Sequence, residues 1–264
     1  MRRSGGTRYA WLDTLSNAVL ALMHQGADLL ANLLFINTAY AWVWSHGLKL
    51  FSADLTGFAV AFLFQDFLYY WFHRASHRVR WLWASHVTHH SSERLNLSTA
   101  FRQSLTYPIS GMWVFWLPMA WVGFAPDVII LVVGLNLAFQ FFVHTELTGR
   151  PGRLGWLFNT PSMHRVHHAR NPGYIDRNFA GVLTIWDRLF GTFVAETERP
   201  EYGIVRQLHT RNPLVLTFHE WRDMFSDAWR ERDWRYLIKP PEWVGPGRLT
   251  GPSLQPDQRR RPHT

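Results

Sequence analysis

The sequence predicts an all-α integral membrane protein with about four transmembrane helices and a cytoplasmic helical cap. Two observations predict this class: long apolar segments without charge, and arginines confined to the other segments. The 264 residues include 15 Trp, 14 His and no Cys, and carry a formal net charge of +8. The lack of Cys in this chain excludes disulfides, thiolate metal sites and iron–sulfur clusters.

Four segments have the length and apolar character of spans, because a bilayer core takes about 20 apolar residues per helix. Residues 103–124 and 128–147 are the clearest, whereas 27–45 is partly polar and 54–72 contains Gln65 and Asp66. Residues 1–26 show helical spacing of apolar side chains beside arginines, which is typical of an interfacial helix. The predicted units are thus 1–26, a four-span region over 27–147, a cap over 148–250 and a disordered tail over 251–264. The alternative, a soluble protein with buried core helices, is disfavoured by two adjacent spans of this length.

The arginines indicate the orientation. With the N-terminus in the cytoplasm, the inner segments 1–26, 73–102 and 148–264 hold all 25 Arg, and the outer turns hold only Lys49. This is the positive-inside pattern of multi-pass membrane proteins. The positive charge therefore indicates contact with anionic lipid at the cytoplasmic face, and we expect no nucleic-acid partner.

Nine histidines fall into a regular order. They form one H-x-x-x-H pair, two H-x-x-H-H clusters and a single His near the end of the last span: His73, His77, His86, His89, His90, His144, His164, His167 and His168. Residues three and four apart share a helix face, so each H-x-x-H-H is expected to form one converging trio. In the predicted topology all nine lie on the cytoplasmic side.

Imidazole binds Zn, Cu, Fe and Ni well, so these histidines are candidate metal ligands; the alternative for His144 alone is an interfacial histidine. Nine ligands are too many for one ion, and divide as four and five around two metals. Such a site at a membrane face indicates redox chemistry on a substrate dissolved in the bilayer. The alternative from another class is a non-catalytic metal-binding or transport protein, but a transporter needs ligands near the midplane.

Asp66 lies two helical turns before His73 within a predicted span, and an ionisable group there is a functional candidate. We expect its carboxylate to orient a ligand histidine through the ring N–H. The alternative is a hydrogen bond between helices, to Asn136 or Gln140.

Four motifs carry a resemblance to a known family: DFLYYWFHRASH (66–77), THHSSERLNLSTAFRQS (88–104), FNTPSMHRVHH (158–168) and NFAGVLTIWDRLFGTF (178–193). Together, over about residues 55–205, they resemble the fatty acid hydroxylase superfamily, the sterol desaturase-type membrane di-iron enzymes. They are most similar to the branch that cleaves the ether bond of alkylglycerols with tetrahydrobiopterin.

The resemblance implies an O2-dependent monooxygenase that hydroxylates or desaturates a membrane lipid, with a sterol-type desaturase as the alternative. It implies two Fe, which Zn can replace in a purified sample, and electrons from tetrahydrobiopterin or a separate reductase. Asn178 and Asp187 match the family pattern and are expected to support the ligands; for Asp187 the alternative is an ion pair with Arg188. Two positions depart from the ether-cleaving branch, with Arg78 in place of Glu and Met163 in place of His.

Overall fold

The structure, a computed structural model, describes residues 9–52, 54–149 and 152–243. The predicted tail 251–264 lies outside these residues. Within them every regular element is a helix, and β-pairing is limited to two isolated bridges, Phe158 with Leu183 and Ala169 with Tyr202. The all-helical part of the predicted fold class is therefore confirmed.

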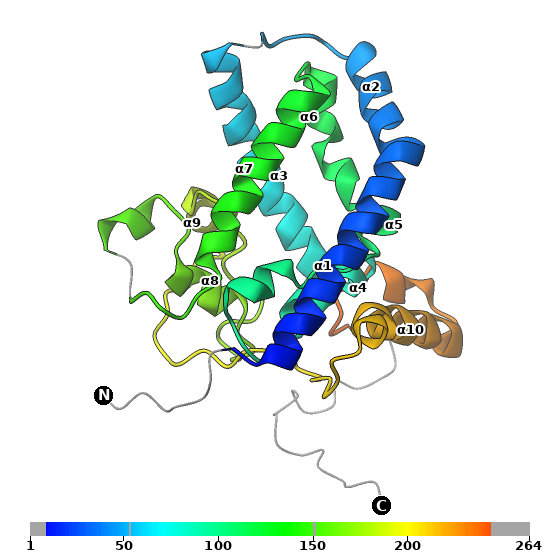
Figure 1. Ribbon diagram of the computed structural model, residues 1–264, viewed down its shortest axis with the longest axis vertical. Helices are drawn as coiled ribbons and strands as arrows, with labels where there is room; N and C mark the ends of the chain where they lie inside the picture. The colour runs from blue at the N-terminus through cyan, green and yellow to red at the C-terminus, as the bar shows by residue number, and fades with distance from the viewer. Residues whose placement is uncertain (1–8, 53, 150–151, 244–264) are drawn as a thin grey trace, which may run out of the picture.

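Within the described residues, three helices are long and apolar enough to cross a membrane, and they run along the long axis of the molecule (Figure 1). The first is continuous from Trp11 to Ser45 and comprises α1 (Trp11–Ala31), a π-helical segment η1 (Asn32–Ile36) and α2 (Asn37–Ser45). The others are α3 (Leu55–Arg78) and α7 (Pro126–Val143). The first helix passes residue 26 without a break, so the sequence expected to form an interfacial helix and the first predicted span share one helix.

The predicted third span, 103–124, differs from expectation because it forms no single long helix. It contains α5 (Tyr107–Ser110), the 3-10 helix η3 (Met112–Trp116) and α6 (Leu117–Val122). Pro108 and Pro118 each lie in the first turn of a short helix, where the missing N–H is harmless, and Gly111 between them adopts φ of +79°. This segment still reaches the end of the molecule where α2 finishes, because Leu48 N donates to Trp121 O at 2.7 Å.

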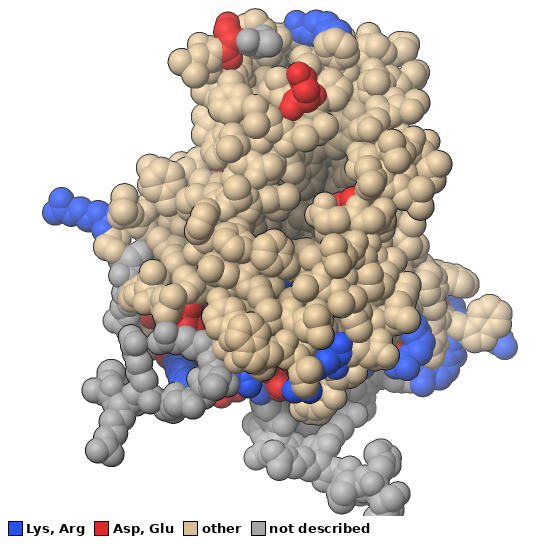
Figure 2. Space-filling view, viewed as in Figure 1, with Lys and Arg blue, Asp and Glu red and all other residues tan. Residues whose placement is uncertain are grey.

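The remaining helices gather at the opposite end, around the lower parts of the long helices in Figure 1. They are α4 (Arg80–His90), η2 (Leu97–Phe101), η4 (Arg153–Trp156), α8 (Pro161–His167), α9 (Ile185–Leu189), α10 (Pro213–Glu231) and η5 (Trp234–Leu237). Figure 2 shows most charged side chains at this end and a broad uncharged band above it. The buried Arg80, which pairs with Glu220 and Asp227 of α10, ties α4 to α10.

The apolar core lies between α3, α7 and the η3–α6 segment. It is formed by buried side chains such as Tyr69, Phe72, Met119 and Val132. Because α3 continues beyond this core by more than a turn, its last residues carry His73 and His77 into the end that holds α4 and α8. The fold thus brings the three histidine clusters to one end of the apolar helices.

Candidate metal centre

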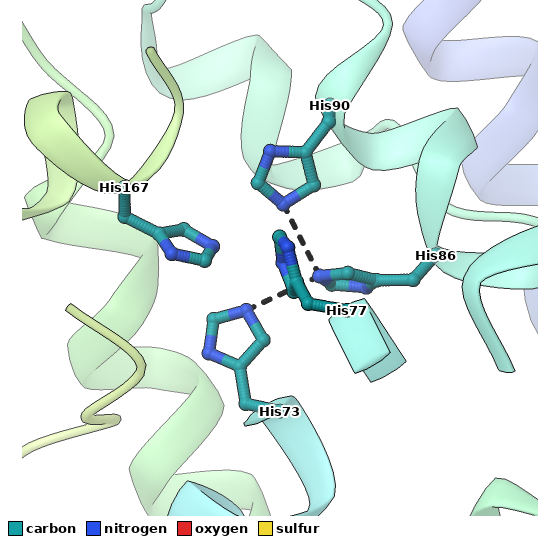
Figure 3. Close-up of side chains that lie close together, drawn as sticks. All are labelled: His73, His77, His86, His90 and His167. Carbon is teal, nitrogen blue, oxygen red and sulfur yellow. Dashed lines mark hydrogen bonds between the residues drawn. The ribbon is translucent and has the colours of Figure 1, made fainter. Parts of the chain in front are cut away.

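All nine predicted histidines lie together and are buried, and they form two groups. The five-histidine group contains His73, His77, His86, His90 and His167, and the four-histidine group contains His89, His144, His164 and His168. In each group one nitrogen from every ring lies within 4.8 Å of the others. Figure 3 shows the rings of the first group turned toward one another from α3, α4 and α8.

The two H-x-x-H-H clusters do not form the expected converging trios. On α4, His86 and His90 belong to the five-histidine group whereas His89 belongs to the other; on α8, His164 and His168 share a group and His167 joins the opposite one. At 100° per residue, positions i and i+4 lie about 40° apart, but i+3 is rotated about 60° to the other side of i. Each cluster therefore contributes to both groups and holds them side by side.

Backbone carbonyls orient several of the rings. The Nδ1 atoms of His73, His144 and His167 lie 2.9, 2.7 and 2.9 Å from the carbonyl oxygens of Phe179, Gln140 and Arg177, respectively. The Nδ1 of His89 is 3.3 Å from the carbonyl of Arg102. A carbonyl oxygen only accepts, so the proton of each neutral ring is on Nδ1. The Nε2 lone pair is then free to bind a metal ion.

Several Nε2 atoms lie closer to one another than is favourable for two neutral hydrogen-bond acceptors. His73 and His86 approach to 3.1 Å, and His144 and His164 to 2.9 Å. Nε2 of His77 and of His167 is buried without a hydrogen-bond partner. Burial, reinforced by neighbouring imidazoles, lowers the pKa well below the usual 6.5 for His86, His89, His90, His164, His167 and His168. Neutral, convergent and partnerless nitrogens are the donor set that a transition metal ion fits.

Asp66 does not contact a histidine, so the expected direct orientation of a ligand is wrong. The buried carboxylate accepts from Asn136, as the alternative predicted, and also from the backbone N–H groups of Val182 and Leu183 and from the Trp186 indole. These bonds, of 2.8–3.0 Å, satisfy the carboxylate with the segment after residue 178. Asp66 therefore acts indirectly. It fixes the loop that contains Phe179, and the Phe179 carbonyl holds the ring of His73.

Asp187 and Asn178 hold the same loop from its other side. Asp187 accepts from the N–H groups of Phe179 and Ala180 at 2.8 and 2.9 Å. The alternative ion pair with Arg188 is absent from the described contacts of Asp187, because Arg188 instead stacks on Phe193. Asn178, at φ of +56°, donates to the carbonyls of Met163 and Val194 and so joins the loop to α8.

Two supporting side chains were not foreseen from the sequence. Tyr107 places its hydroxyl 2.9 Å from Nδ1 of His86, and Asp176 places a carboxylate oxygen 3.5 Å from Nδ1 of His77. The other oxygen of Asp176 accepts from Arg78 at 2.6 Å. Burial raises the pKa of Asp176, but the bond to His77 and the charge of Arg78 outweigh burial and hold that pKa below its usual range. The positive charge of Arg78 is thus compensated at the rim of the site.

Comparison with known proteins gives a consistent family assignment. The fatty acid hydroxylase family model matches residues 58–192. Alkylglycerol monooxygenase of Homo sapiens is 42% identical over 219 residues, which cover 80% of this chain and 48% of that protein. The Xenopus tropicalis protein of the same name is 45% identical over 193 residues, 72% of this chain and 43% of that protein.

A more distant relative, Ornithine lipid hydroxylase OlsE of Rhizobium tropici, is 33% identical over 129 residues, 48% of this chain and 39% of that protein. The chain spans about half the length of the alkylglycerol monooxygenases of Homo sapiens and Xenopus tropicalis. No solved structure matches the chain. All nine histidines of the two groups lie within the residues that the family model covers.

Proposed function

This chain belongs to the fatty acid hydroxylase family, and from that premise we propose that it is a membrane-bound, non-haem di-iron oxygenase that uses O2 to hydroxylate a lipid C–H bond. The observation that supports the proposal most directly is the division of nine buried histidines into groups of five and four. The grouping fits two metal ions side by side.

The nine histidines are the proposed ligands. Each of the two groups offers one ion an all-imidazole environment, which suits Fe and equally Zn in a purified sample. Two iron ions held there would supply the activation of O2 that attack on an unactivated C–H bond requires. An ion held by the four-histidine group would keep room for an exchangeable ligand.

The protein itself would position the ligand rings and keep water out of the site. The carbonyls of Phe179, Gln140 and Arg177 fix the rings, and Asp66 and Asp187 fix the loop that contains the first of these carbonyls. Burial of every ring excludes bulk water from the site and keeps the ligands neutral. A lipid would enter sideways from the bilayer, with its apolar chain between the long helices.

We propose four membrane crossings, with the α5–η3–α6 segment as the third. The support is that this segment returns to the end where α2 finishes, where Leu50 N donates to Val122 O at 3.0 Å. The arginine distribution favours a cytoplasmic position for the histidine end, which also holds α10 and its charged residues. The residues after α7 would then form the cytoplasmic cap.

Electrons would come from tetrahydrobiopterin or from a separate reductase. A polar cavity of about 390 Å³ adjoins the end of α4 and is lined in part by Asp13, Ser91, Arg102 and Arg211. Its carboxylate and guanidinium groups are hydrogen-bond partners that a polar heterocycle could use.

For the substrate, an ether lipid of the alkylglycerol type is supported by the names of the relatives at 42% and 45% identity. Hydroxylation of a lipid such as an ornithine lipid has weaker support, at 33% identity over less of the chain. A sterol-type desaturase remains the alternative within the family, and a non-catalytic metal-binding protein the alternative outside it.

The test has two parts. The purified protein is reconstituted with iron under anaerobic conditions. The lipids of cells that express the protein are then compared with those of cells that express H168A. We expect O2-dependent loss of one lipid class in the first cells only. A product two hydrogen atoms lighter would favour desaturation, and an aldehyde with free glycerol would favour ether cleavage. An unchanged lipid profile with metal bound would favour the non-catalytic alternative.

A further inference from the structure

Two acidic side chains lie in the middle of the long apolar helices, away from the first and last turns, and their surroundings differ. Asp66 on α3 is fully buried and accepts four hydrogen bonds. Asp28 on α1 keeps 37% of its side chain exposed, and its carboxylate has one described contact, with Nε2 of His24 at 3.4 Å. That separation is longer than a normal N–H···O bond. The ionisable group of Asp28 is thus incompletely satisfied beside the bilayer, where such groups are costly.

The second nitrogen of His24, Nδ1, is buried. It makes no hydrogen bond of normal geometry in the described part of the chain, although the ring interacts with the backbone of Ser104. An i,i+4 pair of this kind stabilises a helix only slightly. Stabilisation of α1 therefore does not account for placing two ionisable side chains on a lipid-facing helix.

The pair lies next to the histidine groups. The ring of His24 packs edge-on against the ring of Tyr107, with 5.2 Å between centroids, and the Tyr107 hydroxyl is 2.9 Å from Nδ1 of His86. One aromatic ring therefore separates His24 from a member of the five-histidine group. Figure 2 shows a hollow in the uncharged band between the edges formed by α1 and α7, with an acidic group at its margin.

We infer that His24 and Asp28 form a headgroup subsite, in which a hydroxyl of the lipid substrate donates to the Asp28 carboxylate and lies against the His24 ring. This inference rests on the proposed function. A hydroxyl suits the pair because it both donates and accepts. A phosphate would be repelled by Asp28, and an ammonium group would compete with the adjacent imidazole. A headgroup held there would place the nearest chain carbons beside the histidine groups.

The test uses the full chain in phosphatidylcholine nanodiscs and measures binding without turnover. The probes are a 1-O-pyrenyldecyl glycerol and its 2,3-di-O-methyl ether, detected by energy transfer from tryptophan to pyrene. We expect the unmodified protein to bind the diol about tenfold or more tightly than the dimethyl ether, as hydrogen bonds to a charged group allow. D28N and H24A should both lose this preference, while binding of the dimethyl ether stays unchanged.

Q25A is the matched control, because Gln25 is exposed on the same helix, and it should keep the preference. Equal binding of both probes by the unmodified protein, or a preserved preference in D28N and H24A, would overturn the inference. So would an equal loss of both probes with metal content intact, because that result indicates damage not specific to hydroxyls. H89A should retain the preference, because it removes a proposed metal ligand and leaves the subsite intact. If the unmodified, iron-loaded protein shows the preference but forms no O2-dependent product, the oxygenase proposal fails and the subsite stands.

Discussion

The Nε2 atoms of His89 and His144 face each other at 3.2 Å, although Nδ1 of each ring is directed at a backbone carbonyl. With both ring protons used in this way, the two facing nitrogens present lone pairs to each other. Such an arrangement is unfavourable without a cation between or beside the rings. The pair belongs to the four-histidine group, and it links the end of α7 to α4.

Removal of metal should therefore destabilise the protein. An ion that binds only the folded state at about 1,000 times its Kd adds about 4 kcal/mol of stability. We expect the chelated protein to unfold at a clearly lower temperature than the Fe- or Zn-loaded protein in the same detergent. Identical melting curves with and without bound metal would contradict this expectation.

His89→Ala should remove one ligand from the four-histidine group and leave the other group complete. Bound metal should fall from two ions per chain toward one, with loss of lipid turnover, as measured by elemental analysis and product assay. His46→Ala is the control, because His46 is exposed directly after α2, at the far end of the molecule, and belongs to neither group. Two ions still bound to H89A would argue against the ligand assignment.

Asp176→Asn should weaken metal binding in the five-histidine group alone. The substitution removes the negative charge beside Nδ1 of His77 but suits the backbone, since Asn tolerates φ of +57°. Loss of a supporting carboxylate typically costs about tenfold or more in metal affinity. Arg78→Gln, the control at the other oxygen of Asp176, should have a smaller effect. Competition with a chromophoric chelator measures both, and equal affinities for D176N and R78Q would refute the role of Asp176.

Gly181→Ala should disturb the loop that supports His73. A Cβ at Gly181 would lie 2.8 Å from Oδ1 of Asn136 and from a ring carbon of Tyr69, both buried. We expect a loss of about 1–3 kcal/mol in the free energy of unfolding, together with weaker metal binding. Gly134→Ala on α7 meets no heavy atom within 4 Å and should be neutral or stabilising. The prediction fails if the two variants unfold alike.

The membrane orientation can be tested cleanly because the chain has no Cys. We expect an impermeant maleimide to label S52C in intact cells, and to label R222C only after permeabilisation. Both positions are exposed in the structure. Labelling of both variants in intact cells would place the α2–α3 turn and α10 on the same side of the membrane and would exclude the proposed topology.

The nine site histidines could be selected from the sequence because their spacing is dense and ordered, and imidazole chemistry limits what such a pattern does. The sequence already indicated groups of four and five, but which histidine belongs to which group required the structure. The split of each H-x-x-H-H depends on where two ions would lie relative to α4 and α8, which local spacing does not specify. The roles of Asp66 and Asp176 depend on the loop after residue 175, where positive φ at Asp176 and Asn178 turns the backbone toward the rings.

The third span shows a different reason for failure. Hydropathy sums the hydrophobicity of the side chains in a sequence window. Residues 103–124 are uncharged throughout, so hydropathy predicts a span there. It gives no weight to Pro108, Pro118 or the left-handed Gly111, which divide the segment into short helices. For the continuous helix from Trp11 to Ser45 the error is the opposite one. The mixed polarity of its sequence suggested a boundary after residue 26, where no residue ends the helix.

The carbonyl contacts of His73, His89, His144 and His167 also bear on how the protein can change over evolution. A main-chain oxygen is present whatever side chain occupies positions 102, 140, 177 and 179, so substitutions there need not disturb the imidazoles they restrain. Substitutions of side chains near the site can then change the lipid preference while the geometry of the ligand histidines is retained.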